Sequence, residues 1–109
     1  MTTIDDAGAN VAVRLVLVFP PRLEEAVTEA LVATPGMPGF TLLQAEGHSS
    51  DFAHASAAEQ VRGRVERRVL WMLLPPAQVE GVLAQLRQDV DAHDVRWWLE
   101  PVLAMGRLG

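Results

Sequence analysis

Apolar runs and helical patterns alternate along the chain, and the same order occurs twice. Residues 17–31 (LVFPPRLEEAVTEAL) align with residues 72–86 (MLLPPAQVEGVLAQL) at an offset of 55 positions. In each half a run of aliphatic residues ends at two prolines, after which apolar residues recur at helical spacing. A proline at the first position of a helix loses no hydrogen bond, so each proline pair predicts the start of a helix.

These patterns predict that each half of the chain forms a strand, a helix and a second strand. In chain order we expect a strand at 11–19, a helix from Pro21, strands at 40–46 and 65–74, a helix from Pro76 and a strand at 95–100. Val102–Met105 fits a short fifth strand. Two such halves predict an α+β fold of the ferredoxin-like, split βαβ type, in which two helices lie on one face of an antiparallel four-stranded sheet.

Both faces of this predicted sheet carry apolar side chains. In the strand at 65–74, Trp71 lies on one face and Met72 on the other. Trp97 and Trp98 likewise point in opposite directions. Each face therefore needs to be shielded from water.

Two helices can shield only one face of a sheet. Soluble monomers rarely expose an apolar patch as large as the other face would be. We therefore expect identical copies of the chain to cover the second face, in a homotrimer whose sheets face inward. The alternative is that residues 1–10 and 101–109 of the same chain cover it.

Length, composition and charge limit the function. Half of the 109 residues are apolar, which indicates one folded domain at residues 11–109, preceded by a polar, disordered tail at 1–10. No apolar run approaches the roughly 20 residues of a membrane span, so we expect no direct membrane insertion. The chain has no Cys, as is typical of a cytoplasmic protein. A formal net charge of −5 argues against binding to nucleic acid.

The polar segment 47–63 (GHSSDFAHASAAEQVRG) lies between the two halves and is longer than most connections in compact domains. Its length indicates a binding role, and we expect contacts with a partner protein from His48, Asp51, Phe52, His54 and Glu59. Imidazole and carboxylate groups suit zinc, copper, nickel or cobalt, so His48, Asp51 and His54 are also candidate ligands of a divalent transition metal. Their spacing matches no standard metal motif, and the alternative is that they are solvated loop side chains.

Arginines follow this segment in the chain. Arg62, Arg64, Arg67 and Arg68 carry the guanidinium groups that hold phosphates and carboxylates well, so they predict a site for an anion or a nucleotide. The alternative is a charge cluster in which they pair with Glu46, Glu59 and Glu66. The sequence offers no nucleophile beside a recognisable base and contains neither Cys nor Lys, so we expect no enzymatic activity.

The chain resembles the PII-like signalling superfamily in the order of its elements and in three segments. These are Gly47-His48 at the start of the long loop, the run Ala58–Gly63, and a basic strand that leads into Leu73-Leu74-Pro75-Pro76. More narrowly, residues 11–107 are similar to a small bacterial PII-like family often encoded beside heavy-metal efflux pumps. The resemblance implies a trimer of ferredoxin-like subunits. It also implies that the segment 47–63, the T-loop of such proteins, docks onto a partner protein, typically a membrane transporter such as a heavy-metal efflux pump.

Many proteins of this superfamily bind an adenine nucleotide or another small effector between subunits, at the base of the T-loop. The resemblance implies effector contacts from Gly47, Arg62, Arg64, Arg67 and His93. The chain departs from the nitrogen-regulator pattern because it lacks the glycine-rich phosphate loop before the last strand, the T-loop tyrosine and the phosphate-binding lysines. We therefore expect a non-enzymatic regulatory protein. The alternatives are a metal-binding or metal-tolerance protein and a nucleotide-binding module.

Overall fold

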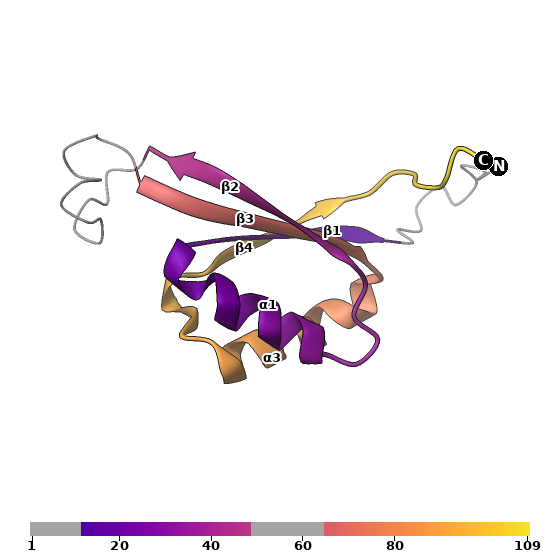
Figure 1. The fold of residues 1–109 in the computed structure, drawn as a ribbon. Coiled ribbons are helices and arrows are strands. Elements are labelled where there is room, and N and C mark those ends of the chain that lie inside the picture. The colour runs from indigo at the N-terminus through magenta and orange to yellow at the C-terminus, as the bar shows by residue number, and fades with distance from the viewer. Residues whose placement is uncertain (1–11, 49–64) are drawn as a thin grey trace.

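A computed structural model describes residues 12–48 and 65–109, and they form a four-stranded antiparallel sheet in the order β2-β3-β1-β4. Both helices lie on one face of this sheet (Figure 1), and this confirms the predicted α+β, ferredoxin-like arrangement. The strands are β1 (Val13–Phe19), β2 (Phe40–Gly47), β3 (Val65–Leu74) and β4 (Arg96–Pro101).

Each proline pair starts a helix, as predicted, but the first turn is a 3-10 turn in both cases. The turn η1 (Pro21–Leu23) precedes α1 (Glu24–Ala33), and η3 (Pro76–Gln78) precedes α3 (Val79–Asp89). The backbone N–H of Leu23 donates to the Pro20 carbonyl at 3.0 Å, and that of Gln78 donates to the Pro75 carbonyl at the same distance. The repeat seen in the sequence therefore corresponds to a repeated structure, in which a proline pair and a 3-10 turn lead into an α-helix.

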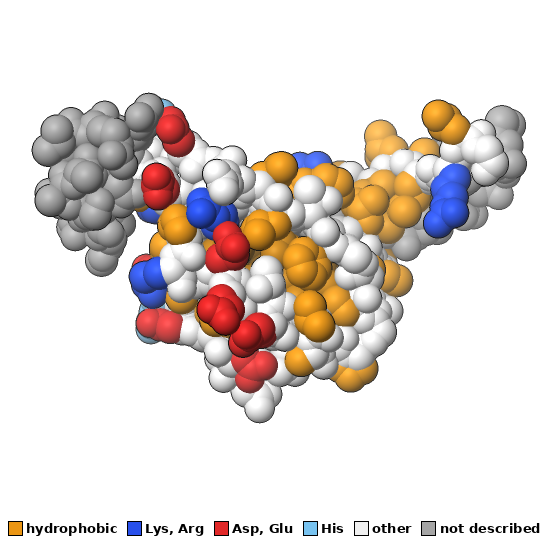
Figure 2. All heavy atoms as spheres, in the orientation of Figure 1, with side chains coloured by type: hydrophobic (Ala, Val, Ile, Leu, Met, Phe, Trp, Pro, Cys, Tyr) orange, Lys and Arg blue, Asp and Glu red, His pale blue; other side chains and the backbone are white. Residues whose placement is uncertain are grey.

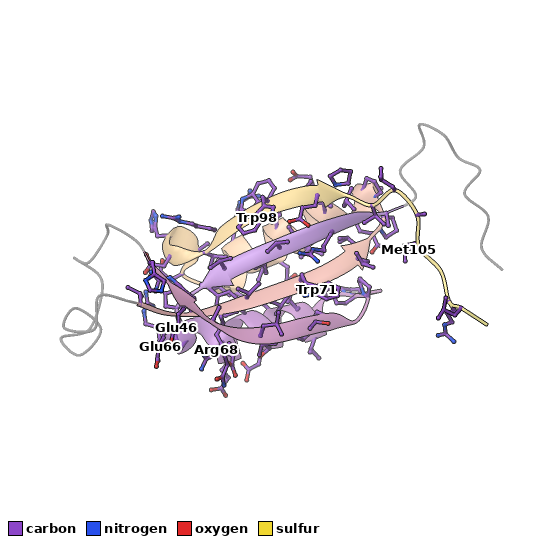
Figure 3. All side chains as sticks on the ribbon, turned by 90° about the horizontal axis from the view of Figure 1, so that it is seen from above. Glu46, Glu66, Arg68, Trp71, Trp98 and Met105 are labelled. Carbon is purple, nitrogen blue, oxygen red and sulfur yellow. The ribbon has the colours of Figure 1, made fainter. Side chains whose placement is uncertain are left out.

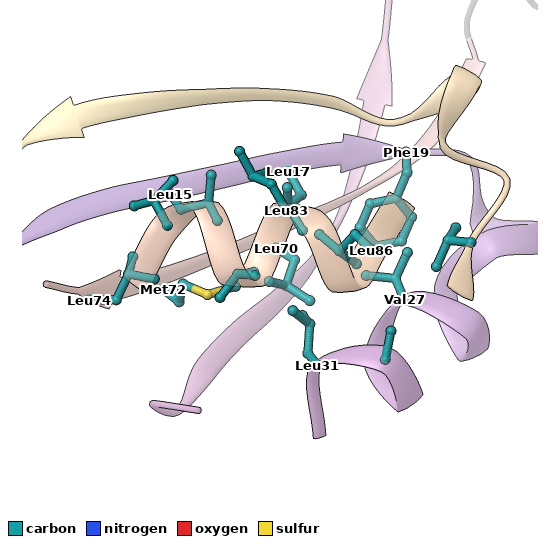
Figure 4. Packing of buried hydrophobic residues seen from close by; sticks show 14 of the residues in the cluster. Leu15, Leu17, Phe19, Val27, Leu31, Leu70, Met72, Leu74, Leu83 and Leu86 are labelled. Atoms are coloured by element: carbon teal, nitrogen blue, oxygen red, sulfur yellow. The ribbon is translucent and has the colours of Figure 1, made fainter. Parts of the chain in front are cut away.

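The hydrophobic core lies between the sheet and the two helices (Figure 4). The helical stripes predicted from spacing point into it, with Val27 and Leu31 from α1 and Leu83 and Leu86 from α3 buried. The sheet supplies alternate residues of its central strands, which are Val13, Leu15, Leu17, Phe19, Leu70, Met72 and Leu74. Alternation along each strand places every second side chain on this face.

Four predicted strand ends differ from the structure by one or two residues. β1 begins at Val13 instead of residue 11, β2 runs one residue further, to Gly47, and β4 spans Arg96–Pro101 instead of 95–100. The expected fifth strand at Val102–Met105 does not form: residues 102–109 have no helix or strand. A strand needs a neighbour to accept and donate its hydrogen bonds, and the sequence pattern alone does not supply one. None of the helices in the described ranges is both long and apolar enough to cross a membrane.

The sheet face opposite the helices, here called the open face, also carries apolar residues. Val16 lies at its centre, only 2% exposed, between its cross-strand neighbours Trp71 and Trp98. Leu43 on β2 remains 48% exposed and Trp98 on β4 43% exposed. Residues 102–109 leave the sheet beyond the end of β4 instead of folding over this face (Figure 1). The predicted cover by residues 101–109 of the same chain is therefore wrong, while the tail at 1–10 lies outside the described residues.

Candidate functional site

One end of the sheet extends as a two-stranded ribbon. β1 ends at Phe19, which pairs with Arg68, but the pairing of β2 with β3 continues for three more residue pairs, ending at Gly47 and Val65. At about 3.3 Å per residue, the ribbon extends roughly 10 Å beyond the end of β1. Figure 1 shows this ribbon projecting from the body of the molecule. The segment between Gly47 and Val65 therefore joins the fold at the tip of a projecting hairpin.

Two ion pairs lie at the sheet end from which this ribbon extends: one joins β3 to α1, and the other joins η1 to the turn before β4. The Arg68 Nε donates to the Glu24 Oε1 at 2.7 Å, and the Arg68 side chain is only 19% exposed. Arg22, in the turn after β1, pairs with Asp94 in η4 (Ala92–Asp94). Sequence reasoning did not predict either pair, because the partners lie 44 and 72 positions apart. The register of β1 with β3 brings the start of α1 next to Arg68, and this register is not readable from local patterns.

Gly47 and Arg67, two of the predicted effector residues, are in contact at the ribbon. A Cβ built on Gly47 would lie 3.5 Å from the Arg67 Cγ, so the Arg67 side chain passes over the Gly47 backbone. The Arg67 Nη1 donates to the Glu66 carbonyl at 2.9 Å. His48 follows Gly47 and is exposed at the end of β2. The described part of the ribbon thus carries one basic side chain, Arg67, on β3 and one imidazole, His48, directly after β2.

His93, the other described effector candidate, is exposed in η4, at the sheet end where β4 begins. Its neighbour Asp94 is the partner of Arg22. The ribbon carries Gly47 and Arg67 outward from this end, whereas His93 stays beside the turn that follows β1. The structure therefore places these candidates at one end of the molecule without joining them in a single pocket of one subunit.

Most of the loop candidates lie outside the described residues. This applies to the partner-contact, metal-ligand and effector candidates Asp51, Phe52, His54, Glu59, Arg62 and Arg64. Of the proposed metal ligands, only His48 is described. Within the described ranges, no three His, Asp or Glu side chains are grouped so that they could hold a metal ion.

The open face carries a second cluster of polar and aromatic groups, which the sequence analysis did not identify. The Arg14 guanidinium lies 5.0 Å from the centre of the Trp71 ring, and the Arg14 Nε lies 2.9 Å from the Glu100 Oε1. The Nε atom is buried and its N–H is not aligned for a hydrogen bond, so the contact with Glu100 is an ion pair. The Trp98 Nε1 donates to the Glu100 Oε2 at 2.8 Å.

These four residues form a charge-neutral network on β1, β3 and β4, with Trp71 and Trp98 on the upper face in Figure 3. The signal for it was present in the sequence, since Arg14 is the one charged residue in an otherwise apolar strand. Only the strand register shows that its partner is Glu100, because β1 and β4 pair Arg14 with Glu100 directly.

A groove of about 290 Å³ lies at the far end of the helix layer, between the turn after α1 and the start of α3. Its lining consists of Thr34, Pro35, Met37, Pro38, Gln78, Gly81, Val82 and Gln85. These side chains include neither an acid nor a base. The groove therefore offers no group for proton transfer or nucleophilic attack.

Comparison with known proteins places this fold among related structures. The family model described as "Protein of unknown function (DUF3240)" matches residues 9–109. The chain is similar to the crystal structure of a DUF3240 family protein from Shewanella baltica OS155, with a TM-score of 0.74 and 21% identity over 93% of this chain and 100% of that one. Comparison with the curated proteins gave no match.

Two further solved structures share the fold at lower similarity. One is PII from Arabidopsis thaliana bound to citrate, with a TM-score of 0.66 and 16% identity over 92% of this chain and 85% of that one. The other is CPII, a nitrogen regulatory PII-like protein from Thiomonas intermedia K12 bound to ADP, AMP and bicarbonate. It has a TM-score of 0.65 and 18% identity over 88% of this chain and 93% of that one. The chain belongs to the DUF3240 family, and its fold is that of the PII-like proteins.

Proposed function

We propose that this protein is a non-enzymatic, PII-like regulatory protein that docks onto a partner protein through the segment 47–63. The observation that carries the proposal is the ribbon of β2 and β3, which projects beyond the end of β1 and joins this segment to the fold. The ion pair of Arg68 on β3 with Glu24 on α1 holds the base of the ribbon against the helix layer. Because the base of the ribbon is held in place, we expect binding of a partner to the segment to affect the sheet end to which the ribbon is joined.

We propose that three copies assemble with their open faces inward. The support is the open face itself, where Leu43 and Trp98 remain about half exposed while the helices cover the other face. Closed rotational symmetry is the common arrangement for identical subunits. In such an assembly each ribbon would stand beside a neighbouring subunit, and a ligand could contact both.

The proposed effector is a small anion bound near the base of the ribbon. Gly47, Arg67 and His93 are the described candidates, and Arg62 and Arg64 complete the set. Arg22 and Arg68 already pair with carboxylates, so they have less capacity for a phosphate. The PII structure from Arabidopsis thaliana holds citrate and CPII holds ADP, AMP and bicarbonate, which supports an anionic effector. An effector acts on the segment if it binds one of its conformations more tightly than another.

The proposed partner is a membrane transporter such as a heavy-metal efflux pump, and the protein itself is proposed to act in the cytoplasm.

A second candidate function is metal binding by His48, Asp51 and His54. One observation favours it: His48 is exposed at the tip of the ribbon. Calorimetric titration with zinc, copper, nickel and cobalt distinguishes the two, because a metal-binding protein must bind one of them more tightly than about millimolar at neutral pH.

The docking role is tested by replacing residues Ser49–Val61 with a Gly/Ser linker of equal length. The bait is the tagged protein in native lysate, with and without added metals and adenine nucleotides, and captured membrane proteins are identified by mass spectrometry. We expect the variant to assemble as the unmodified protein does and to lose the captured transporter. A matched control replaces Val32, an exposed residue of α1, with Ser. Equal capture by the linker variant would refute the role of the segment.

A further inference from the structure

Residues 102–109, here called the C-terminal arm, follow β4 without packing on the described body of the chain. No hydrogen bond among the described residues joins the arm to the sheet or the helices. Leu103 is 88% exposed, Met105 is 43% exposed and Leu108 is fully exposed. Figure 3 shows the arm, with Met105 labelled, turning away beyond the end of the sheet.

The composition of the arm is that of a contact segment. Five of its eight residues are apolar, namely Val102, Leu103, Ala104, Met105 and Leu108, and Arg107 is its one charged residue. Large aliphatic side chains gain nothing from remaining in solvent, because their exposure to water is unfavourable. Figure 2 shows hydrophobic side chains standing out along the arm. The arm therefore carries apolar surface that residues 12–48 and 65–101 of its own subunit leave uncovered.

The open face of the sheet is a matching apolar surface on the same molecule. Its uncovered residues include Leu43 and Trp98, with Trp71 half-buried between the strands that carry them. An arm of eight residues spans roughly 26 Å when extended, and four adjacent strands span about 14 Å between the outer two. The arm is thus long enough to cross all four strands. Because it points away from its own sheet, it can do so on a second copy.

We propose that the C-terminal arm lies in extended form on the open face of a neighbouring copy of this chain and so straps the subunits together. Leu103 and Met105 supply the apolar contacts. The inference rests on the proposed self-association, and it adds the segment that completes the interface. It also explains why residues with strand-like patterning form no fifth strand within one subunit.

The first test measures self-association by sedimentation velocity over a range of protein concentrations. The variant carries Leu103→Ser, Met105→Ser and Leu108→Ser, and its matched control carries Val32→Ser, a 73% exposed residue on α1. We expect the arm variant to need at least about tenfold more protein for half-assembly, while the control does not change. Circular dichroism should be unchanged in both, because the arm lies outside the core.

The two proposals fail in distinguishable ways. If the unmodified protein assembles and the arm variant assembles equally well, the proposed contact of the arm with a neighbouring copy is refuted, while self-association stands. If the unmodified protein is a monomer at all concentrations, both are refuted.

The second test locates the arm on the neighbour. The chain contains no Cys, so introduced cysteines are the only thiols. Copies with Met105→Cys are co-expressed with differently tagged copies carrying Leu43→Cys, and a short bifunctional maleimide links nearby thiols. We expect mixed cross-linked dimers, and far fewer when Val32→Cys replaces Leu43→Cys as the control. Equal cross-linking at positions 43 and 32 would overturn the placement on the open face.

Discussion

At the scale of single residues, the open face has a charged pair arranged so that the face can be covered. Arg14 and Glu100 neutralise each other at 2.9 Å, and Trp98 donates a further hydrogen bond to Glu100. Both charged side chains are 40% exposed in the single chain. An ion pair with this much water around it contributes at most about 1 kcal/mol to the stability of one subunit. The cost of removing one member of the pair should rise when another copy of the chain covers the open face and excludes water from it.

We therefore expect Arg14→Met to weaken self-association by about 2–5 kcal/mol, because it leaves the Glu100 carboxylate buried without its partner. The stability of the single subunit should fall by no more than about 1 kcal/mol. Sedimentation at several concentrations measures the first effect, and urea unfolding of dilute protein measures the second.

The double variant Arg14→Met with Glu100→Met is the control for this prediction. Replacing both members of a buried ion pair with apolar residues is often neutral, so most of the association should return. If the single variant assembles as well as the unmodified chain, the pair lies outside the interface.

At the scale of elements, the backbone conformations that Pro and Gly favour account for where the two helices begin and for the turn that follows α1. The repeated proline pairs start η1 and η3, and the turn after α1 follows the same logic. There Met37 donates to the Thr34 carbonyl at 3.3 Å, with Pro35 second and Gly36 third in the turn. Gly36 has a φ of +68° and is the one residue with positive φ in the described ranges. This is a type II turn, whose third position favours glycine.

Gly36→Ala should destabilise the protein by about 1 kcal/mol, because a Cβ is disfavoured at positive φ. Gly39→Ala is the matched control: its φ is not positive, and a Cβ there also meets no atom within 4 Å. Urea unfolding at one fixed protein concentration compares the two, which matters because assembly makes stability depend on concentration. A loss at Gly39 equal to that at Gly36 would contradict the account of the turn.

A structural feature can be predicted from this sequence when it is determined by residues that are close together in the chain. Alternating strands, helical stripes and proline starts follow from neighbouring residues, and they were predicted within one residue at most ends. The pairing of Arg68 with Glu24 depends on the register of β1 with β3, which no local pattern specifies. The strand expected at Val102–Met105 failed for a related reason, since its sequence pattern is extended but no strand of the described sheet pairs with it.

The candidate site was predicted less completely than the fold. Gly47, Arg67 and His93 lie at one end of the sheet without forming a single pocket in one subunit, so their role in effector binding stays a prediction. If ligands bind between subunits, a single chain supplies only part of the site. The open-face network of Arg14 and Glu100 was missed because its members lie on strands far apart in the sequence.

At the scale of the whole molecule, the central feature is a sheet with two apolar faces and helices on only one. Helices cover the core face, while the open face keeps Trp98 and Leu43 about half exposed. The C-terminal arm adds further uncovered apolar surface at one end, and the ribbon projects at the other. Each of these features is accounted for if identical copies meet at the open face.

The most direct test of this claim is the mass of the particle in solution. Sedimentation equilibrium of the unmodified chain at micromolar concentration should give a single species of three times the 11.9 kDa chain mass. A single ideal species of 11.9 kDa would contradict the account, because the open face would then remain in water on every molecule.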